Sequence, residues 1–485
     1  MNGGPGMTGL ILNEPLLWER GRKGRCGFSL PERDVPENPL PAELTGEGPE
    51  FPDLSEVEVV RHYTRLSTWN YGVDTGLYPL GSCTMKYSPK TNERQAALKG
   101  FAAAHPLLPP QLSQGALRLM AELERDLAEI TGLDAVTLQP AAGAQGELAG
   151  MLIIHAYHRS RGRQRTKILV PDTAHGTNPA SAALCGYAPV PVPSDGRGII
   201  APETVSELMD DDTAGIMITN PNTLGLFEEN IREVARIVHE RGGLVYGDGA
   251  NTNAVMGIVK PGAIGVDILH LNLHKTFSSP HGGGGPGAGP VAVRKELARF
   301  LPVPRVVETD GTYALREDFP DSIGRLLAFH GHFGVLVRAY SYIRSMGPDG
   351  LRQASRLAVL NANYLREKLK GALHLAYDRP CMHECVFSDR DQRAEGITTL
   401  DMAKRLMDYG YHPPTIYFPL VVRGAIMIEP TETETKEELD RFAGVFRAIV
   451  REAKQNPKLL REAPGLCKVR RLDETAAARN PCLTG

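Results

Sequence analysis

The sequence LVYGDGA at residues 244–250 and the sequence DILHLNLHKT at residues 267–276 decide the fold. Each contains a short, mostly apolar run, which is typical of a strand in a parallel sheet covered by helices on both faces. Asp248 closes the first run, and Lys275 follows the second. The carboxyl ends of the strands form the ligand-binding edge of an open α/β sheet, so we expect both side chains at that edge.

These two runs belong to a series of six apolar runs that alternate with helical stretches. The runs are Ala135–Leu138, Lys167–Val170, Gly215–Thr219, Leu244–Gly247, Ile268–Leu273 and Pro290–Val293. The stretch Glu229–Arg241 has the apolar spacing of a crossover helix. Ahead of the first run, a stripe with spacings of three and four predicts a helix that Gly132 ends; its members are Leu117, Met120, Leu123, Leu127 and Ile130. The alternation predicts an α/β fold with a mostly parallel sheet.

Composition and pattern divide the chain into four regions. Residues 1–75 are rich in proline, glycine and charge, and we interpret them as an extended N-terminal arm that wraps another surface, such as that of a partner chain. A disordered tail is the alternative for residues 1–15. Residues 76–330 form the predicted large α/β domain. The remaining predicted regions are a smaller α+β domain at 331–455, with helical stretches 356–369, 399–409 and 436–454 around strand-like pieces near 384–387 and 425–429, and a C-terminal tail at 456–485.

Bulk properties exclude several classes of protein. A chain of 485 residues exceeds one ordinary core, and 42% hydrophobic with 23% charged residues is typical of a globular protein. A net charge near -3 gives no reason to expect nucleic acid or an anionic membrane. We find no secretory signal and no apolar run that could span a bilayer. Seven scattered cysteines suit a reducing cytoplasm better than a disulfide framework.

Lys275 is the strongest candidate for a covalent role. A lysine amine becomes a nucleophile only when burial or its neighbours lower its pKa. A lysine in this position is usually a surface residue, but His274 and Thr276 suit phosphate contacts, and Gly282–Gly285 permits close backbone approach or a mobile loop. A phosphate-binding P-loop is excluded, because His274 and Leu269 occupy the positions where that motif needs glycines.

Asp248 taken alone predicts a turn or a helix cap. One connection and one strand separate it from Lys275, and a carboxylate in that place can keep a pyridine nitrogen protonated, so that the ring accepts electrons. The small-residue turn Ala141–Gly146 follows a strand and precedes the helical stretch Glu147–His158, whose free N–H groups favour a phosphate. Together these segments predict pyridoxal 5'-phosphate, a cofactor with a pyridine ring, an aldehyde and a phosphate.

Three other segments carry polar side chains of interest. His175, in AHGTNP at residues 174–179, could stack on the cofactor ring, with a structural loop histidine as the alternative. Asn220 begins the rigid polar stretch NPNTLG at 220–225 and should line the same crevice. The sequence CMHEC at 381–385 suggests a metal, because alternate strand residues share a face. No second ligand pair lies nearby at metal-site spacing, so we predict no metal.

Five segments resemble one family. They are GSCTMK at 81–86, HGTNPASA at 175–182, TNPNT at 219–223, HKTF at 274–277 with the glycines that follow, and FHGHFG at 329–334. These motifs are similar to the glycine decarboxylase (P-protein) of the glycine cleavage system, and the similarity runs from about residue 60 to RLDE at 471–474. The length fits the C-terminal half of the long single-chain form, so the chain resembles subunit 2 of the two-subunit form.

The resemblance implies a type I fold of pyridoxal-phosphate-dependent transferases and an α2β2 heterotetramer with a homologous subunit 1. By resemblance, Lys275 is the Schiff-base lysine, Asp248 pairs with the pyridine nitrogen and His175 stacks on the ring. The predicted catalytic residues are Lys275, His175 and Asp248, and the predicted cofactor-binding set adds Gly143, Ala144, Gln145, Ala250, His274, Thr276 and Asn220. By resemblance, Gly143, Ala144 and Gln145 are the residues that bind the phosphate.

The implied reaction is decarboxylation of glycine, with release of CO2 and transfer of the aminomethyl group to the lipoyl arm of a carrier, the H-protein. One alternative is another enzyme of this fold, such as an amino-acid decarboxylase or a cysteine desulfurase, which would share Lys275 and Asp248. A desulfurase also needs a mobile cysteine, and we see none in an obvious flexible loop. The other alternative is a supporting subunit without catalysis, which has no use for the Asp248 and Lys275 pair.

Overall fold

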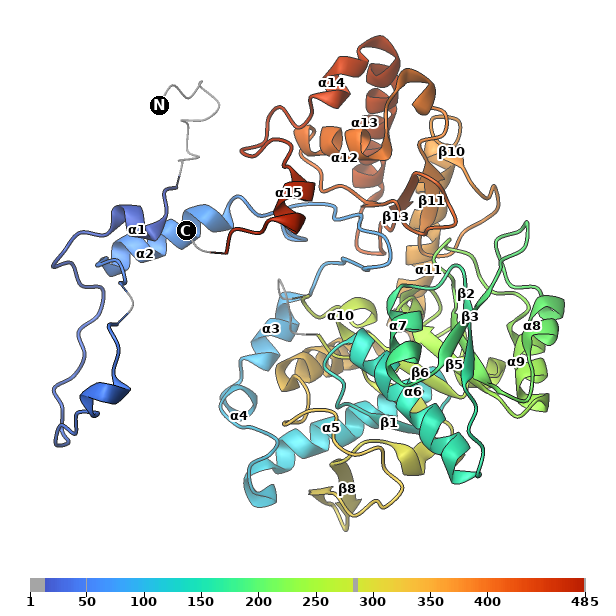
Figure 1. The fold of residues 1–485 in the computed structure, drawn as a ribbon, viewed down its shortest axis with the longest axis horizontal. Helices are drawn as coiled ribbons and strands as arrows, with labels where there is room; N and C mark the ends of the chain where they lie inside the picture. Colours follow the sequence, from blue (N-terminus) through green and yellow to red (C-terminus); the bar gives the residue numbers. More distant parts are fainter. Residues whose placement is uncertain (1–13, 49, 282–286, 484–485) are drawn as a thin grey trace. The chain divides into compact units, whose positions relative to one another are not determined.

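The computed structural model describes residues 14–48, 50–281 and 287–483 of a chain that falls into two compact units, Met1–Gly76 (unit 1) and Leu77–Gly485 (unit 2) (Figure 1). The predicted boundaries at residues 330 and 455 stay a prediction. Among the described residues, no helix has both the length and the apolar character that a membrane crossing requires.

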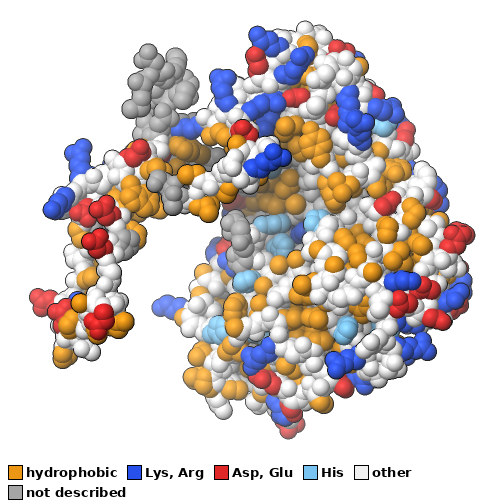
Figure 2. Space-filling view, in the orientation of Figure 1, with side chains coloured by type: hydrophobic (Ala, Val, Ile, Leu, Met, Phe, Trp, Pro, Cys, Tyr) orange, Lys and Arg blue, Asp and Glu red, His pale blue; other side chains and the backbone are white. Residues whose placement is uncertain are grey.

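Unit 1 contains little regular structure. Its elements are α1 (Leu17–Arg20), the short 3-10 helix η2 (Ala42–Leu44) and α2 (Glu56–Ser67). Ser55 and Glu58 form a capping box that starts α2. The Ser55 hydroxyl accepts from the Glu58 N–H, and the Glu58 carboxylate accepts from the Ser55 N–H. Large apolar side chains are exposed along this unit, among them Trp18, Phe28 and Leu30 (Figure 2).

A seven-stranded sheet forms the centre of unit 2. Its strands are β1 (Ala135–Thr137), β2 (Lys167–Pro171), β3 (Ala188–Val192), β4 (Thr213–Thr219), β5 (Leu244–Gly249), β6 (Ile268–Leu271) and β7 (Val291–Val293), in the order β1-β7-β6-β5-β4-β2-β3. Pairing is parallel from β3 through β2, β4 and β5 to β6, and β7 runs antiparallel to both of its neighbours. The predicted α/β fold with a mostly parallel sheet is confirmed.

Helices cover both faces of this sheet (Figure 1). One face packs on α5 (Pro110–Thr131), α8 (Pro202–Leu208), α9 (Ile231–Glu240) and the first part of α11 (Phe333–Leu369). The other face packs on α6 (Gly143–Ser160), α7 (Thr177–Leu184) and the 3-10 helix η5 (Lys295–Phe300). The helix predicted to stop at Gly132 does so: Gly132 has φ 68°, and its N–H donates to the Ala128 carbonyl.

Short elements connect these layers. They are α3 (Lys90–Ala96), α4 (Lys99–Ala102), η3 (Thr252–Ala254), η4 (Pro261–Ile264), α10 (Leu273–Thr276) and the hairpin of β8 (Arg305–Thr309) with β9 (Thr312–Arg316). Two features differ from the sequence expectation. The strand predicted to reach Leu273 ends at Leu271, and Lys275 lies in the single helical turn α10. The sequence pattern also misses β3, because its prolines are tolerated only at a sheet edge.

A second, four-stranded antiparallel sheet lies in the C-terminal part of unit 2. Its strands, in the order β10-β11-β13-β12, are β10 (His374–Leu375), β11 (Cys385–Ser388), β13 (Ala425–Ile428) and β12 (Thr415–Ile416). The remaining elements of the C-terminal part are η6 (Arg393–Glu395), α12 (Thr399–Asp408), α13 (Lys436–Gln455), α14 (Pro457–Arg461) and α15 (Glu474–Arg479). We call this part the small α+β region; a second buried apolar cluster holds it together.

Candidate active site

Three polar side chains form a row across the carboxyl ends of the central strands. The register of the sheet sets Thr219 of β4 opposite Asp248 of β5, and Asp248 opposite His270 of β6. All three are buried. Since strand residues in register share a face of the sheet, the row exists only because these strands pair in parallel.

Asp248 is the charged member of this row. Its Oδ1 accepts from the Ala250 N–H at 2.9 Å and lies 3.3 Å from His270 Nε2, while its Oδ2 accepts from Asn178 Nδ2 at 3.2 Å. Burial by itself would raise the pKa of Asp248, but His270, the Ala250 N–H, the Lys275 charge and Asn178 outweigh it and hold the pKa below its ordinary value. The carboxylate is therefore ionised at neutral pH.

A cavity of about 230 Å³ opens over this row. It is lined by Ser82, Gly143, Ala144, Glu147, His175, Thr177, Thr219, Thr223, Asp248, Ala250, His270, Asn272, His274 and Lys275. Figure 2 shows histidine side chains gathered in a hollow of unit 2. Seven of the ten sequence-predicted residues line one cavity: Lys275, Asp248, His175, Gly143, Ala144, Ala250 and His274.

The start of α6 forms one wall of the cavity. Its N-cap residue, Ala142, provides no side-chain hydrogen bond to the first helical N–H groups. Such groups, with the positive end of the helix dipole, favour a phosphate. A side chain at Gly143 would place its Cβ 2.5 Å from Asn272 Oδ1, and one at Gly146 would lie 2.8 Å from the Gly289 carbonyl oxygen. Glycine at both positions therefore lets the helix start approach the sheet closely.

Lys275 is half-buried in α10 at the other wall. Its neighbour His274 accepts from the Ala288 N–H through Nδ1 at 3.3 Å, and burial lowers the pKa of this imidazole to about 3. Because this imidazole is neutral, it adds no positive charge next to the Lys275 amine. The predicted glycine run Gly282–Gly285 lies outside the described residues.

His175 lines the cavity from the loop after β2. Its Nδ1 lies 3.1 Å from Thr177 Oγ1, and its ring contacts Phe418 edge-on with centroids 5.6 Å apart. Partial desolvation lowers the pKa of this imidazole, although the Asp248 charge acts in the opposite direction. The lowered pKa keeps this imidazole neutral at pH 7. Its predicted stacking role stays a prediction.

Three predicted residues do not line the cavity. Gln145 turns away, since its Oε1 accepts from the Ala141 N–H at 2.7 Å and its Nε2 donates to the Leu326 carbonyl at 3.2 Å. Asn220 accepts from the Glu228 N–H and lines a separate small space beneath β4 and β5. The Thr276 side chain is fully buried outside the lining.

The sequence reasoning missed two titratable residues of the site, Glu147 and His270. Glu147 is buried on the first turns of α6, and burial, with the nearby Asp248 charge, raises its pKa to about 9. His270 contacts the Tyr246 hydroxyl through Nδ1 at 2.6 Å. The alternation of polar His270 and Asn272 in the apolar run at 268–273 was the signal that could have identified His270.

Two groups of metal-ligating type occur among the described residues. Glu147, Asp248 and His270 form one group, and His383, Glu384 and Glu429 form the other. The first belongs to the cavity, where a protonated Glu147 and a neutral His270 leave Asp248 as the one anion of the group. Within CMHEC at 381–385, Cys381 and Cys385 pack into the apolar core of the small α+β region. The absence of a structural metal stays a prediction.

The donor set fits the cofactor predicted from the sequence. An ionised buried carboxylate, a lysine amine, a neutral imidazole and an uncapped helix start line one cavity. These are the groups that a pyridine nitrogen, an aldehyde, an aromatic ring and a phosphate require.

Comparison with known proteins gives two family matches. Residues 30–315 match the family model described as glycine cleavage system P-protein. Residues 354–462 match the model described as glycine dehydrogenase, C-terminal domain.

Curated relatives match over nearly the full chain. A probable glycine dehydrogenase (decarboxylating) subunit 2 from Caldanaerobacter subterraneus is 58% identical over 474 residues, which cover 96% of this chain and 98% of the relative. The protein of the same description from Halalkalibacterium halodurans is 56% identical over 477 residues, with 97% and 98% covered.

Solved structures share the fold. A glycine decarboxylase (P-protein) of the glycine cleavage system in inhibitor-bound form superposes with a TM-score of 0.73 at 22% identity, over 84% of this chain and 93% of that one. A cysteine desulfurase from Thermococcus onnurineus gives 0.62 at 18% identity, over 78% and 95%. The type I fold is thereby confirmed.

Proposed function

This chain belongs to the glycine cleavage system P-protein family as its subunit 2, and we propose how its residues carry out the reaction. It is a pyridoxal-phosphate-dependent enzyme that decarboxylates glycine. Our proposal adds transfer of the aminomethyl group to the lipoyl arm of an H-protein. The observation that supports it most is the meeting of Asp248, Lys275 and the uncapped start of α6 in one cavity.

Each wall of the cavity has a binding task in this proposal. Lys275 Nζ would bind the aldehyde carbon of the cofactor, the Asp248 carboxylate would hold a proton on the pyridine nitrogen, and the N–H groups from Gly143 onward would bind the phosphate. His175 would lie against the ring. Bound there, pyridoxal phosphate supplies an electron-accepting ring for the electron pair that remains when glycine loses CO2.

The protonation states of the residues suit the two halves of the reaction. The Cα–carboxylate bond of glycine breaks and CO2 leaves; the remaining carbon then bonds to one lipoyl sulfur, the disulfide breaks, and the second sulfur takes a proton. Glu147 is protonated at neutral pH because its pKa is about 9, so it is the carboxylic acid on the cavity wall that can donate. His175 is neutral and can accept a proton.

Partners are part of the proposal. The description "subunit 2" of the relatives implies a subunit 1, and we propose an α2β2 heterotetramer in which the exposed apolar side chains of unit 1 contact that partner. The lipoylated H-protein is the second partner. We also propose a cytoplasmic location, with no nucleic acid or membrane partner, in keeping with the bacterial relatives and the scattered cysteines.

Glycine-dependent exchange of labelled bicarbonate into the glycine carboxyl tests the function. The assay contains this chain, pyridoxal phosphate and a lipoyl carrier, with and without subunit 1. We expect exchange that requires subunit 1 and is abolished by Lys275→Ala. Lys260→Ala is the matched control, because Lys260 is an exposed lysine of the same unit that pairs with Glu129.

The possible results separate the alternatives. Exchange that survives Lys275→Ala would exclude a covalent role for this lysine. Binding of the cofactor to Lys275 without exchange under any condition would retain the cofactor assignment and point to another amino-acid substrate, such as that of a different decarboxylase of this fold.

A further inference from the structure

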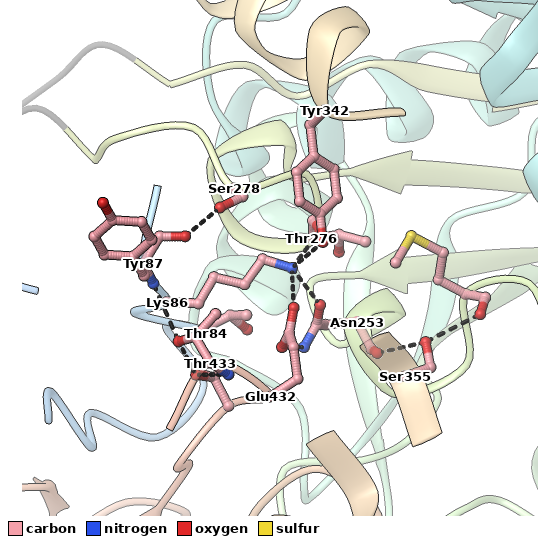
Figure 3. A network of polar contacts seen from close by, with 12 residues as sticks. Thr84, Lys86, Tyr87, Asn253, Thr276, Ser278, Tyr342, Ser355, Glu432 and Thr433 are labelled. Carbon is pink, nitrogen blue, oxygen red and sulfur yellow. Dashed lines mark hydrogen bonds and ion pairs between the residues drawn. The ribbon is translucent and has the colours of Figure 1, made fainter. Parts of the chain in front are cut away.

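Lys86 is a buried lysine outside the cavity lining. Its side chain is 1% exposed, and its Nζ donates to Glu432 Oε1 at 2.7 Å, to the Thr276 carbonyl at 2.7 Å and to Asn253 Oδ1 at 2.8 Å (Figure 3). An ammonium has three N–H donors, and these three short contacts are enough to engage them, with the Tyr342 hydroxyl as a fourth, longer acceptor at 3.4 Å. The charge is therefore removed from water but fully hydrogen-bonded, which is the condition under which a buried lysine persists.

The ammonium form is favoured at neutral pH. Burial by itself would lower the pKa of Lys86, but the Glu432 carboxylate and the Tyr342 hydroxyl outweigh it, so the pKa is raised. Nζ lies 3.4 Å from Tyr342 Oη and 5.0 Å from the centre of its ring. Lys86 is thus a permanent cation at a fixed point.

The partners of Lys86 come from segments that carry the site. Thr276 follows Lys275 and ends the single turn α10, and its carbonyl accepts from the Lys86 ammonium. Asn253 lies in η3, the first helical turn after Asp248 and β5. Glu432 follows β13 of the small α+β region, and its Oε2 accepts from Asn253 Nδ2 at 3.1 Å. One ammonium therefore joins the turn after Lys275 to the turn after Asp248.

A second contact fixes the same turn. Ser278 has φ 55°, a left-handed conformation that a residue other than glycine keeps only when its surroundings hold it. Its hydroxyl donates to the carbonyl of Tyr87, the residue after Lys86, at 2.6 Å. The Tyr87 N–H donates in turn to Thr433 Oγ1 at 3.2 Å. Consecutive residues thus hold the Thr276–Ser278 turn at two points and reach the Glu432 segment at two points (Figure 3).

We propose that Lys86 is a positioning residue for Lys275: its ammonium fixes the end of α10 against η3, so that the Lys275 amine and the Asp248 carboxylate keep one separation. Through Glu432, that separation also depends on the small α+β region. The inference rests on the proposed function, since it takes Lys275 and Asp248 as the two groups that hold the cofactor. A misplacement of about 1 Å at a reacting group can cost on the order of 10²-fold in rate.

The test uses the holoenzyme assembled with subunit 1. Lys86→Met removes the ammonium but leaves the buried Glu432 carboxylate unmatched, so it is compared with the double variant Lys86→Met/Glu432→Leu, which removes both charges at similar volume. Lys90→Met, an exposed lysine of the next helix, is the control. Readouts are the pH midpoint of the absorbance of lysine-bound cofactor, borohydride trapping mapped to Lys275, and kcat and KM for glycine.

We expect the double variant to keep its melting temperature within a few degrees and to trap the cofactor at Lys275. Its absorbance midpoint should move by about half a pH unit or more, and kcat should fall at least about 10-fold with KM changed less than about threefold. Lys90→Met should match the wild type. A folded double variant with unchanged midpoint and kcat overturns the proposal and leaves Lys86 a structural residue.

Two further results remain decisive. If the double variant fails to fold, Glu432→Gln replaces it: Lys86 keeps its other acceptors, so we expect a smaller midpoint shift in the same direction, and no shift overturns the proposal. If the wild type traps the cofactor and titrates but exchanges no bicarbonate, the proposed function fails on its own, and the midpoint comparison still decides the role of Lys86.

Discussion

The Asp248 side chain has a specific role because its charge is held at the cavity. We expect Asp248→Asn to keep the fold and the hydrogen bond from Ala250, but to lower the exchange rate roughly 10²-fold or more, since a neutral amide cannot hold a proton on the pyridine nitrogen. Asp267→Asn is the matched control. Asp267 is equally buried but pairs with His239 and Arg294. It should lose stability while the rate per folded molecule is kept; equal rate losses in both variants would refute the assignment.

Glu147 makes the free energy of unfolding depend on pH. Its pKa is raised from 4.5 to about 9 in the folded chain, so between these values the folded state holds a proton that the unfolded state has lost. The contribution of this group to stability is therefore complete below pH 4.5 and decreases as pH rises toward 9. Glu147→Gln should remove this decrease. Urea unfolding of both proteins between pH 6 and 9 checks it, and parallel curves for the two would contradict the prediction.

The packing of α6 on the sheet depends on glycines. A Cβ at Gly150 would lie 2.3 Å from Tyr246 Cε2, in a side chain that is fully buried. Gly150→Ala should therefore cost about 1–3 kcal/mol by overpacking. Gly115→Ala in α5 is the control, because nothing lies within 4 Å of its Cβ position; it should stabilise by about 0.4–1 kcal/mol through helix propensity. Denaturant midpoints measure both, and a neutral Gly150→Ala would mean that α6 can shift.

Unit 1 exposes large apolar side chains, and burial of these side chains against a partner would be favourable. Phe28 and Leu30 are 72% and 82% exposed. If these residues contact subunit 1, the double change Phe28→Ser/Leu30→Ser should weaken the heterotetramer at least about 10-fold and leave cofactor binding by unit 2 unchanged. Sedimentation of the mixed subunits measures the association. Glu32→Ser, an exposed polar residue of the same stretch, should have no effect; an intact tetramer in the double variant would exclude this contact.

Local patterns were sufficient for much of the fold and for the strongest site residues. The apolar runs, the stripe that ends at Gly132 and the polar residue after each strand depend only on nearby sequence, so β4, β5, β6, α5 and the candidates Asp248 and Lys275 could be predicted. The prolines of β3 hid a strand whose edge position alone makes them acceptable. Gln145 and Asn220 followed the right pattern, but local hydrogen bonds turn them from the cavity.

The sequence by itself determined an α/β chain, a cofactor chemistry and the order of the segments that supply it. Only the tertiary structure decided which side chains meet. Strand register set His270 beside Asp248, burial kept Glu147 protonated, and packing of distant segments placed the Lys86 ammonium on the turn after Lys275. Distance, desolvation and charge pairing arise between residues far apart in the chain, so no local pattern can encode them.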